Sequence, residues 1–243
     1  MIGQPWTATA WSLTLLRLFG LDPGSAEAQK AVKLVDDNAK WEYAGEPFFE
    51  GEVEPCINGV TVAIGSYFGV DVSSIVERLL GEQMEDGGWN CEQESGSKRG
   101  SFHTTISVLE GMLEFGKRNG ASAEVDAARV HGEEYLLQRR LLRRLSDGEV
   151  IDEGWKRFSF PNWWHYDVLR GLDYMRQTRQ PDHRMDEALA LVEQHRGGDG
   201  RWLRQKVYPG AIHFDIDEPE GEPSRWITLR ALRVLDWAGA PTN

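Results

Sequence analysis

The chain has 243 residues, of which 40% are hydrophobic, so it is long enough for one globular unit with a sizeable core and too apolar for a disordered tail. Lys and Arg number 27 against 39 Asp and Glu, which gives a net charge of −12. Because phosphate binding needs a basic surface, this charge argues against nucleic acid as a partner. Cys56 and Cys91 are too few for a disulfide framework, so we expect reduced thiols or metal ligands.

The hydrophobic residues also bear on location. No apolar run approaches the roughly 18 residues that a membrane helix needs. The first twenty residues lack the basic and then apolar pattern of an export signal. We therefore expect a cytoplasmic protein that does not insert into a membrane.

Apolar residues recur at three- and four-residue spacing in nine segments, which predicts an all-α protein. The expected helices, in chain order, are 7–21, 25–38, 58–69, 72–83, 102–117, 123–145, 164–177, 185–195 and 224–237. Turns rich in Gly, Pro and Asp separate them, and none of these turns suggests a domain boundary. We therefore expect a single domain over residues 1–243.

Internal repeats suggest how these helices are arranged. The sequence at 18–22 recurs at 67–71, and an apolar pattern with small residues at 108–112 recurs at 168–172 and 228–232. More charged helices lie between these copies. Helices that are apolar nearly all round should lie inside and helices with a charged face outside, which favours a ring of helical hairpins, an α/α toroid. An open superhelical solenoid is the alternative.

Two tryptophan segments point to a known superfamily. One segment is 83–89 (Gln-Met-Glu-Asp-Gly-Gly-Trp), and the other is 194–202, whose last four residues are Asp-Gly-Arg-Trp. Both resemble the glutamine–tryptophan repeat of squalene-hopene cyclases. The resemblance covers most of the chain from Thr7 onward, and it implies the α/α toroid that these cyclases share with protein prenyltransferase β subunits. This chain has fewer helices than a full toroid, so we expect an incomplete or smaller ring, or a gap filled by an oligomer or partner subunit.

In a toroid the inner helices run parallel, so polar residues near their N-termini should meet at one mouth. The helix dipoles there favour an anion, a carboxylate or a thiolate. The candidates are Glu54, Cys56, Asn58, Cys91, His103, His165, Asp167, Arg225 and Trp226.

Three of these candidates suit a metal. Glu54 and Cys56 lie two positions apart in a loop that enters a helix, and His103 starts the next inner helix. One oxygen, one sulfur and one nitrogen ligand with an open fourth position suit a catalytic zinc ion. The trio also resembles the zinc site of protein prenyltransferase β subunits, which implies Glu54, Cys56 and His103 as ligands. Cys91 could supply or compete for a fourth position.

The sequence departs from both families at important positions. Glu46, Glu50, Glu52 and Glu54 lie where prenyltransferases place basic residues for a diphosphate, so we do not expect protein prenylation. Residues 215–218 (Asp-Ile-Asp-Glu) resemble the Asp-x-Asp-Asp motif of cyclases, in which the middle acid protonates the substrate. Here, however, residues 219–223 separate the motif from the next helix.

The remaining candidates are aromatic or titratable. We expect His165 and Asp167 to act in catalysis, although His165 could instead cap a helix or stack on aromatic rings. His213 is either a loop hydrogen-bond donor or a further metal ligand. We expect Trp89 and Trp202 to pack in repeat turns and the arginines at 139–144 to lie on an outer helix. The residues expected to bind substrate are Phe160, Trp163, Trp164, Arg225 and Trp226.

Three functions remain open. The first is a zinc-dependent enzyme acting on a hydrophobic or aromatic small molecule in a central cavity. The second is a terpenoid-cyclase-like acid catalyst without a metal. The third is a non-catalytic toroid that binds a hydrophobic ligand or another protein.

Overall fold

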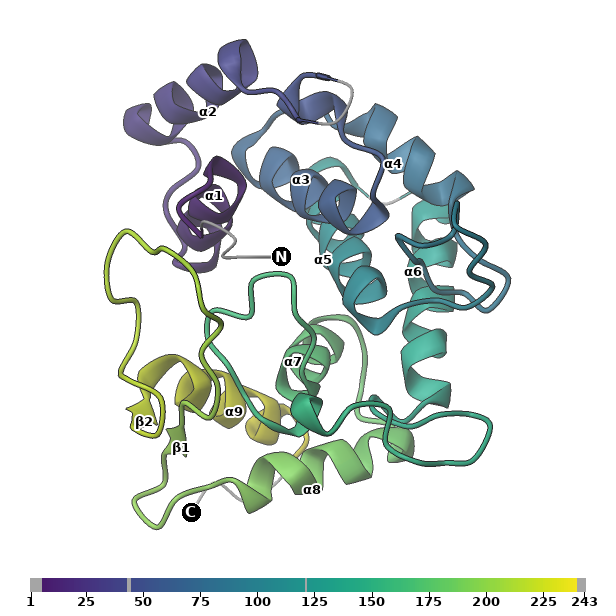
Figure 1. Ribbon diagram of the computed structural model, residues 1–243, viewed down its shortest axis with the longest axis vertical. Coiled ribbons are helices and arrows are strands. Elements are labelled where there is room, and N and C mark those ends of the chain that lie inside the picture. The colour runs from purple at the N-terminus through teal and green to yellow at the C-terminus, as the bar shows by residue number, and fades with distance from the viewer. Residues whose placement is uncertain (1–5, 43–44, 121, 240–243) are drawn as a thin grey trace. The chain divides into compact units, whose positions relative to one another are not determined.

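The computed structural model describes residues 6–42, 45–120 and 122–239 (Figure 1). The described residues are mostly helical, with one two-stranded sheet of two residues per strand, so the expectation of an all-α protein is confirmed. The α-helices are α1 (Thr9–Leu18), α2 (Ala26–Asn38), α3 (Pro55–Phe68), α4 (Ser73–Gly81), α5 (Phe102–Asn119), α6 (Ala123–Gln138), α7 (Val168–Thr178), α8 (Asp186–Gln194) and α9 (Arg225–Trp237). Short 3-10 helices lie at Phe48–Glu50, Glu153–Lys156 and His183–Met185.

Contacts divide the chain into two compact units. The N-terminal unit is Thr7–Tyr135, and the C-terminal unit is Leu136–Asn243 together with Met1–Trp6. Each unit has its own buried core. Arrangement of the helices in a toroid stays a prediction.

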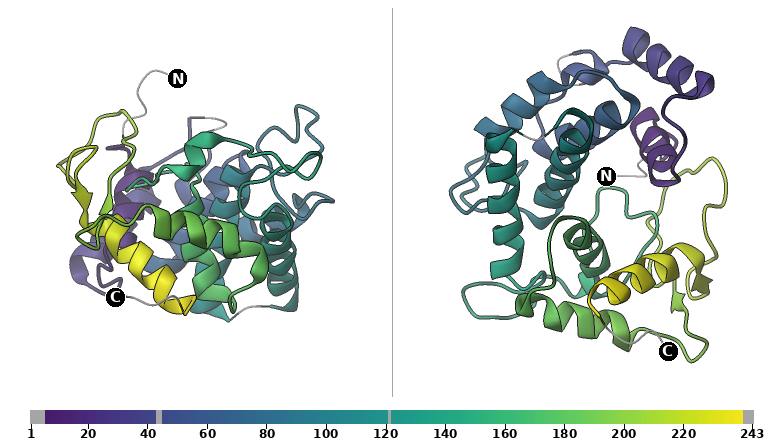
Figure 2. Two further views of the ribbon diagram at one scale, coloured as in Figure 1. Left: turned by 90° about the horizontal axis from the view of Figure 1, so that it is seen from below. Right: turned by 180° about the vertical axis from the view of Figure 1, so that it is seen from behind.

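The N-terminal unit is built on the packing of α3 against α5, which lie side by side (Figures 1 and 2). Gly59 of α3 and Gly111 of α5 allow their backbones to approach closely. A Cβ atom on Gly111 would lie 2.4 Å from the carbonyl oxygen of Gly59, and one on Gly59 would lie 2.5 Å from the carbonyl oxygen of Ser107. Neither position has room for a side chain.

A buried tryptophan fixes the segment between α4 and α5. Trp89 is fully buried, and its indole N–H donates to the carbonyl oxygen of Leu79 near the end of α4, at 2.7 Å. Its backbone N–H donates to the Thr105 hydroxyl of α5, at 3.0 Å. Trp89 therefore connects the C-terminal end of α4 to the first turn of α5 through two hydrogen bonds.

The C-terminal unit contains the same local arrangement. Trp202 is fully buried, its indole N–H donates to Val192 of α8 at 2.7 Å, and its backbone N–H donates to the Thr228 hydroxyl of α9 at 3.0 Å. Strands β1 (Trp202–Leu203) and β2 (Pro223–Ser224) pair antiparallel, with Trp202 opposite Ser224. Both tryptophans thus pack in a turn between two helices, as the sequence predicts.

Each predicted helical segment overlaps one α-helix of the structure, but several boundaries differ. The helix predicted at 58–69 begins earlier, with Pro55 in its first turn. A proline is tolerated there because backbone N–H groups in the first turn of a helix have no hydrogen-bond partner within the helix. The helix predicted from 164 begins only at Val168, because Trp163 takes a left-handed φ of 52° and Asp167 caps the helix.

The prediction that the arginines at 139–144 lie on an outer helix was wrong. Helix α6 ends at Gln138, since Arg140 and Leu141 adopt left-handed φ values of 47° and 65°. Leu141 and Leu142 are buried in the turn that follows, and Arg143 pairs with Glu187. The leucines that resembled a helical stripe belong to this turn.

Within the described part of the chain, no helix combines the length and apolar character needed to cross a lipid bilayer.

The contact between α3 and α5 predicts how two glycines respond to substitution. Gly111→Ala is expected to lower the free energy of unfolding by about 1–3 kcal/mol, because the new methyl group would overlap the Gly59 backbone. Gly81→Ala is the control, since a Cβ at this α4 position meets no atom within 4 Å. Urea denaturation would measure both variants. Equal stability of the two would contradict a close backbone approach at Gly111.

Candidate functional site

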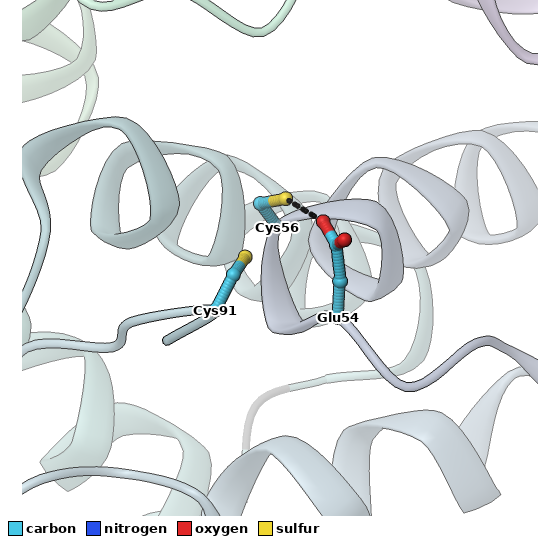
Figure 3. A group of neighbouring side chains, drawn as sticks. All are labelled: Glu54, Cys56 and Cys91. Atoms are coloured by element: carbon cyan, nitrogen blue, oxygen red, sulfur yellow. Dashed lines mark hydrogen bonds between the residues drawn. The ribbon is translucent and has the colours of Figure 1, made fainter. Parts of the chain in front are cut away.

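Three potential metal ligands lie together in the N-terminal unit (Figure 3). One carboxylate oxygen of Glu54 and the sulfur atoms of Cys56 and Cys91 all lie within 4.8 Å of one another. The Cys56 thiol donates a hydrogen bond to Glu54 Oε2 at 3.5 Å. The structure thus brings Glu54 and Cys56 together, as predicted, with Cys91 as the third member.

The start of α3 positions Glu54 and Cys56. Glu54 is the N-cap residue, Pro55 begins the first turn, and Cys56 follows. Buried Asn58 holds the preceding loop, because its side chain accepts from the Glu52 backbone N–H and donates to the Glu52 carbonyl, both at 2.7 Å. The Glu52 carboxylate also accepts from the Glu54 backbone N–H at 2.7 Å. The loop therefore reaches the helix in a fixed conformation.

The loop between Trp89 and α5 carries Cys91. The side-chain amide of Asn90 donates to the hydroxyl of Ser97 at 2.9 Å and to the carbonyl of Arg99 at 2.7 Å, which closes this loop on itself. Cys91 Sγ contacts the Thr104 hydroxyl in the first turn of α5 at 3.5 Å. The cluster therefore joins the first turn of α3 to a loop held against the first turn of α5.

The two thiols affect each other's ionisation. The neighbouring Cys91 thiol, followed by burial, raises the pKa of the Cys56 thiol. The neighbouring Cys56 thiol lowers the pKa of the Cys91 thiol. The N-terminus of α3 favours negative charge nearby.

The donor set suits zinc. Thiolate and carboxylate are both common zinc ligands, at about 2.3 Å and about 2.0–2.2 Å respectively. A tetrahedral ion with these bond lengths requires its ligand atoms to lie about 3.3–3.8 Å apart. Because the three atoms lie within 4.8 Å of one another, each separation has to shorten by about 1.5 Å or less to reach this spacing.

The predicted ligand His103 is not a member of this three-residue group. It is half-buried at the second position of α5, and its carbonyl accepts from the Ser107 hydroxyl at 3.0 Å. Thr104, the next residue, contacts Cys91. His103 therefore lies in the same helical turn as a side chain that touches the cluster, and its role as a ligand stays a prediction.

Asp167 lies at the centre of a buried polar network in the C-terminal unit. It caps α7 by accepting from the Arg170 backbone N–H at 2.8 Å. Its other oxygen accepts from the Ser159 backbone N–H at 3.1 Å and from the Asn162 amide at 2.6 Å. Burial raises the pKa of Asp167, against the opposing effects of Arg230 and these donors. The carboxylate is therefore well satisfied where it stands, and its predicted catalytic role stays untested.

The predicted aromatic residues are stacked on one another. The rings of Trp163 and Trp6 stack 4.7 Å apart, and those of Phe160 and Trp226 stack 5.1 Å apart. His165 lies between two aromatic rings, with its centroid 3.7 Å from Trp164 and 3.4 Å from Tyr208. This geometry matches the alternative interpretation of His165 as an aromatic-stacked histidine.

Two acids of the cyclase-like motif have different surroundings. Asp215 is exposed, whereas Asp217 is buried. Asp217 Oδ2 accepts from the Ser224 hydroxyl at 2.5 Å, and Arg225 Nε lies 4.0 Å from its Oδ1. Arg225, predicted to bind substrate, is exposed and pairs with Glu218 at 3.3 Å. His213 is also exposed in this loop.

Several polar residues around Asp167 had no signal in the sequence. Ser159 and Asn162 surround its carboxylate, Arg230 of α9 donates to the Asn162 side chain, and Tyr208 stacks on His165. Ser159 and Asn162 precede Asp167 by eight and five residues, whereas Tyr208 and Arg230 come from distant segments. Burial in the folded unit is what brings them together.

Comparison with known proteins gave no match: no protein-family model, no curated protein and no solved structure is similar to this chain. The resemblance to prenyltransferases and cyclases therefore stays a hypothesis.

The Asp167 network predicts a large effect of one substitution. Asp167→Ala is expected to lower the free energy of unfolding by about 2–4 kcal/mol, because it removes a helix cap and leaves buried donors without an acceptor. Asp199→Ala is the control, since that exposed carboxylate accepts from the backbone and the side chain of Arg201, two positions along the same turn. Thermal and urea unfolding would compare them. An Asp167→Ala protein as stable as the control would contradict the structural role.

Proposed function

We propose that this protein is a zinc-dependent enzyme of the prenyltransferase and terpenoid-cyclase type, acting on a hydrophobic small molecule, with Glu54, Cys56 and Cys91 as the zinc ligands. The observation that carries the proposal is the closeness of these three ligand atoms, all within 4.8 Å of one another. Glu54 is the N-cap of α3, Cys56 lies in its first turn and Cys91 lies in the loop before α5, so the site depends on the folded chain.

The number of ligands supports catalysis over a structural role. Structural zinc sites close all four positions with Cys and His, whereas three protein ligands leave a position for water or substrate. When bound, zinc would supply a Lewis acid that polarises a substrate oxygen or activates water. Glu54 is exposed and the two cysteines are half-buried, so the open position is accessible from solvent.

The surroundings of the cluster limit the substrate. Glu50 and Glu52 lie in the loop that precedes α3, and Glu92 follows Cys91. These acids favour a neutral or cationic substrate over a diphosphate.

Metal analysis tests the proposal directly. The parent protein, purified with zinc and dialysed, is expected to hold one zinc ion per chain. Cys56→Ala and Cys91→Ala are expected to lose it, and Glu54→Gln is expected to bind it more weakly, because each change removes one ligand. Elemental analysis by mass spectrometry would measure the zinc content.

Two further variants complete this test. Glu92→Gln is the matched control, since Glu92 is an exposed acid beside Cys91 that lies outside the cluster, and it should retain zinc. His103→Ala should also retain zinc; loss of zinc there would add His103 to the ligands. A parent protein without stoichiometric zinc would overturn the proposal.

The acid-catalyst alternative has one observation in its favour. Asp217 is buried, and its Oδ1 has no hydrogen-bond partner within the described part of the chain. A carboxyl group shielded from solvent is what proton donation to an alkene requires. The six residues between this motif and α9 (219–224) therefore do not expose Asp217 to solvent.

Asp217→Asn distinguishes the two functions. If the protein is a metal-free acid catalyst, the parent treated with a chelator should still cyclise a polyprenyl substrate, and Asp217→Asn should not. Gas chromatography of the products would measure this. Loss of activity on chelation would instead favour the zinc-dependent enzyme.

A further inference from the structure

The two sulfur atoms of the cluster are the only two in cysteine side chains of this protein. Cys56 lies in the first turn of α3 and Cys91 in the loop before α5, with both thiols free and less than 4.8 Å apart. A disulfide requires the sulfur atoms to approach to about 2.05 Å. A disulfide within one molecule can only join Cys56 to Cys91.

The loop that carries Cys91 is open to solvent. Glu92 to Gly96 are exposed, and a Cβ on Gly96 would meet no atom within 4 Å. Its internal hydrogen bonds are made by the Asn90 side chain and by backbone groups of the loop itself. Residues 92–96, which follow Cys91, are therefore not packed in the core.

We propose that Cys56 and Cys91 form a reversible redox switch at the metal site, in which a small-molecule disulfide oxidises the pair to an intramolecular disulfide. One thiolate of the pair attacks the small disulfide, forming a mixed disulfide and releasing one thiolate. The second protein thiolate then attacks the protein sulfur of the mixed disulfide and releases the other. The protein pair loses two electrons and two protons, and the small disulfide becomes two thiols.

This switch regulates the zinc site, so its effect on zinc rests on the proposed function. A disulfide sulfur is no longer a thiolate, and the thiolate is the form that binds metal. Oxidation therefore removes two of the three ligands and leaves Glu54 alone, which releases the ion. Reduction by a dithiol restores both ligands.

Thiol counting on the full-length, zinc-free chain tests the switch itself. Oxidised glutathione is added, the remaining thiols are alkylated, and the intact mass is measured. The parent is expected to lose both thiols together, without attached glutathione, and to recover them with a dithiol reductant. Cys56→Ser and Cys91→Ser are expected to retain one attached glutathione, since no second thiol can displace it.

Glu54→Gln separates the switch from the metal site. It retains both thiols, so it should form the disulfide as the parent does, while binding zinc more weakly. In zinc-loaded parent protein, a chromogenic chelator should record one zinc ion released for each disulfide formed. Glu92→Gln is the control and should behave as the parent in both measurements.

The possible results distinguish the two proposals. Glutathione left on the parent protein, or disulfide-linked dimers, would overturn the switch, because the sulfur atoms would not meet within one chain. If the disulfide forms but the protein does not bind zinc, the zinc-dependent function and the release of zinc on oxidation are overturned. The reversible disulfide between Cys56 and Cys91 is then still supported. Zinc bound by a parent that forms no disulfide would overturn the switch alone.

Discussion

The candidate metal site depends on the close packing of α3 against α5. Two glycines, Gly59 and Gly111, remove the side chains that would hold these backbones apart. The first turn of α3 presents Cys56, and the first turn of α5 supports the loop of Cys91 through Thr104. A small change in the spacing of the helices would therefore move the two sulfur atoms relative to each other.

The helices were largely predictable from the sequence because their apolar spacing is regular. The residues at which the helices begin and end were not predictable, because they depend on backbone conformations that the spacing of apolar residues does not determine. Arg140 and Leu141 have left-handed φ values and end α6 early, although the leucines nearby continue the pattern. Asp167 starts α7 late because its carboxylate serves as the cap. The toroid is a question of long-range arrangement and stays a prediction.

The candidate site was predictable where it is local. Glu54 and Cys56 are two residues apart at a helix start, so their spacing already places both side chains together. Cys91 joins them through tertiary packing, and the sequence left its role open. The prediction of His103 depended on the expected convergence of helix N-termini and on a family resemblance, whereas the cluster in this structure follows from distances between atoms. Arg230 shows the same limit around Asp167, because only folding brings this residue of α9 to the Asn162 side chain that donates to Asp167.

The paired tryptophans have a consequence for measuring local opening. Trp89 and Trp202 lie in different units, and each donates its buried indole N–H to a helix carbonyl. Such a proton exchanges with deuterium only when its surroundings open. Their two indole resonances therefore provide one internal reporter for each unit, and their exchange rates would tell whether the units open together or independently.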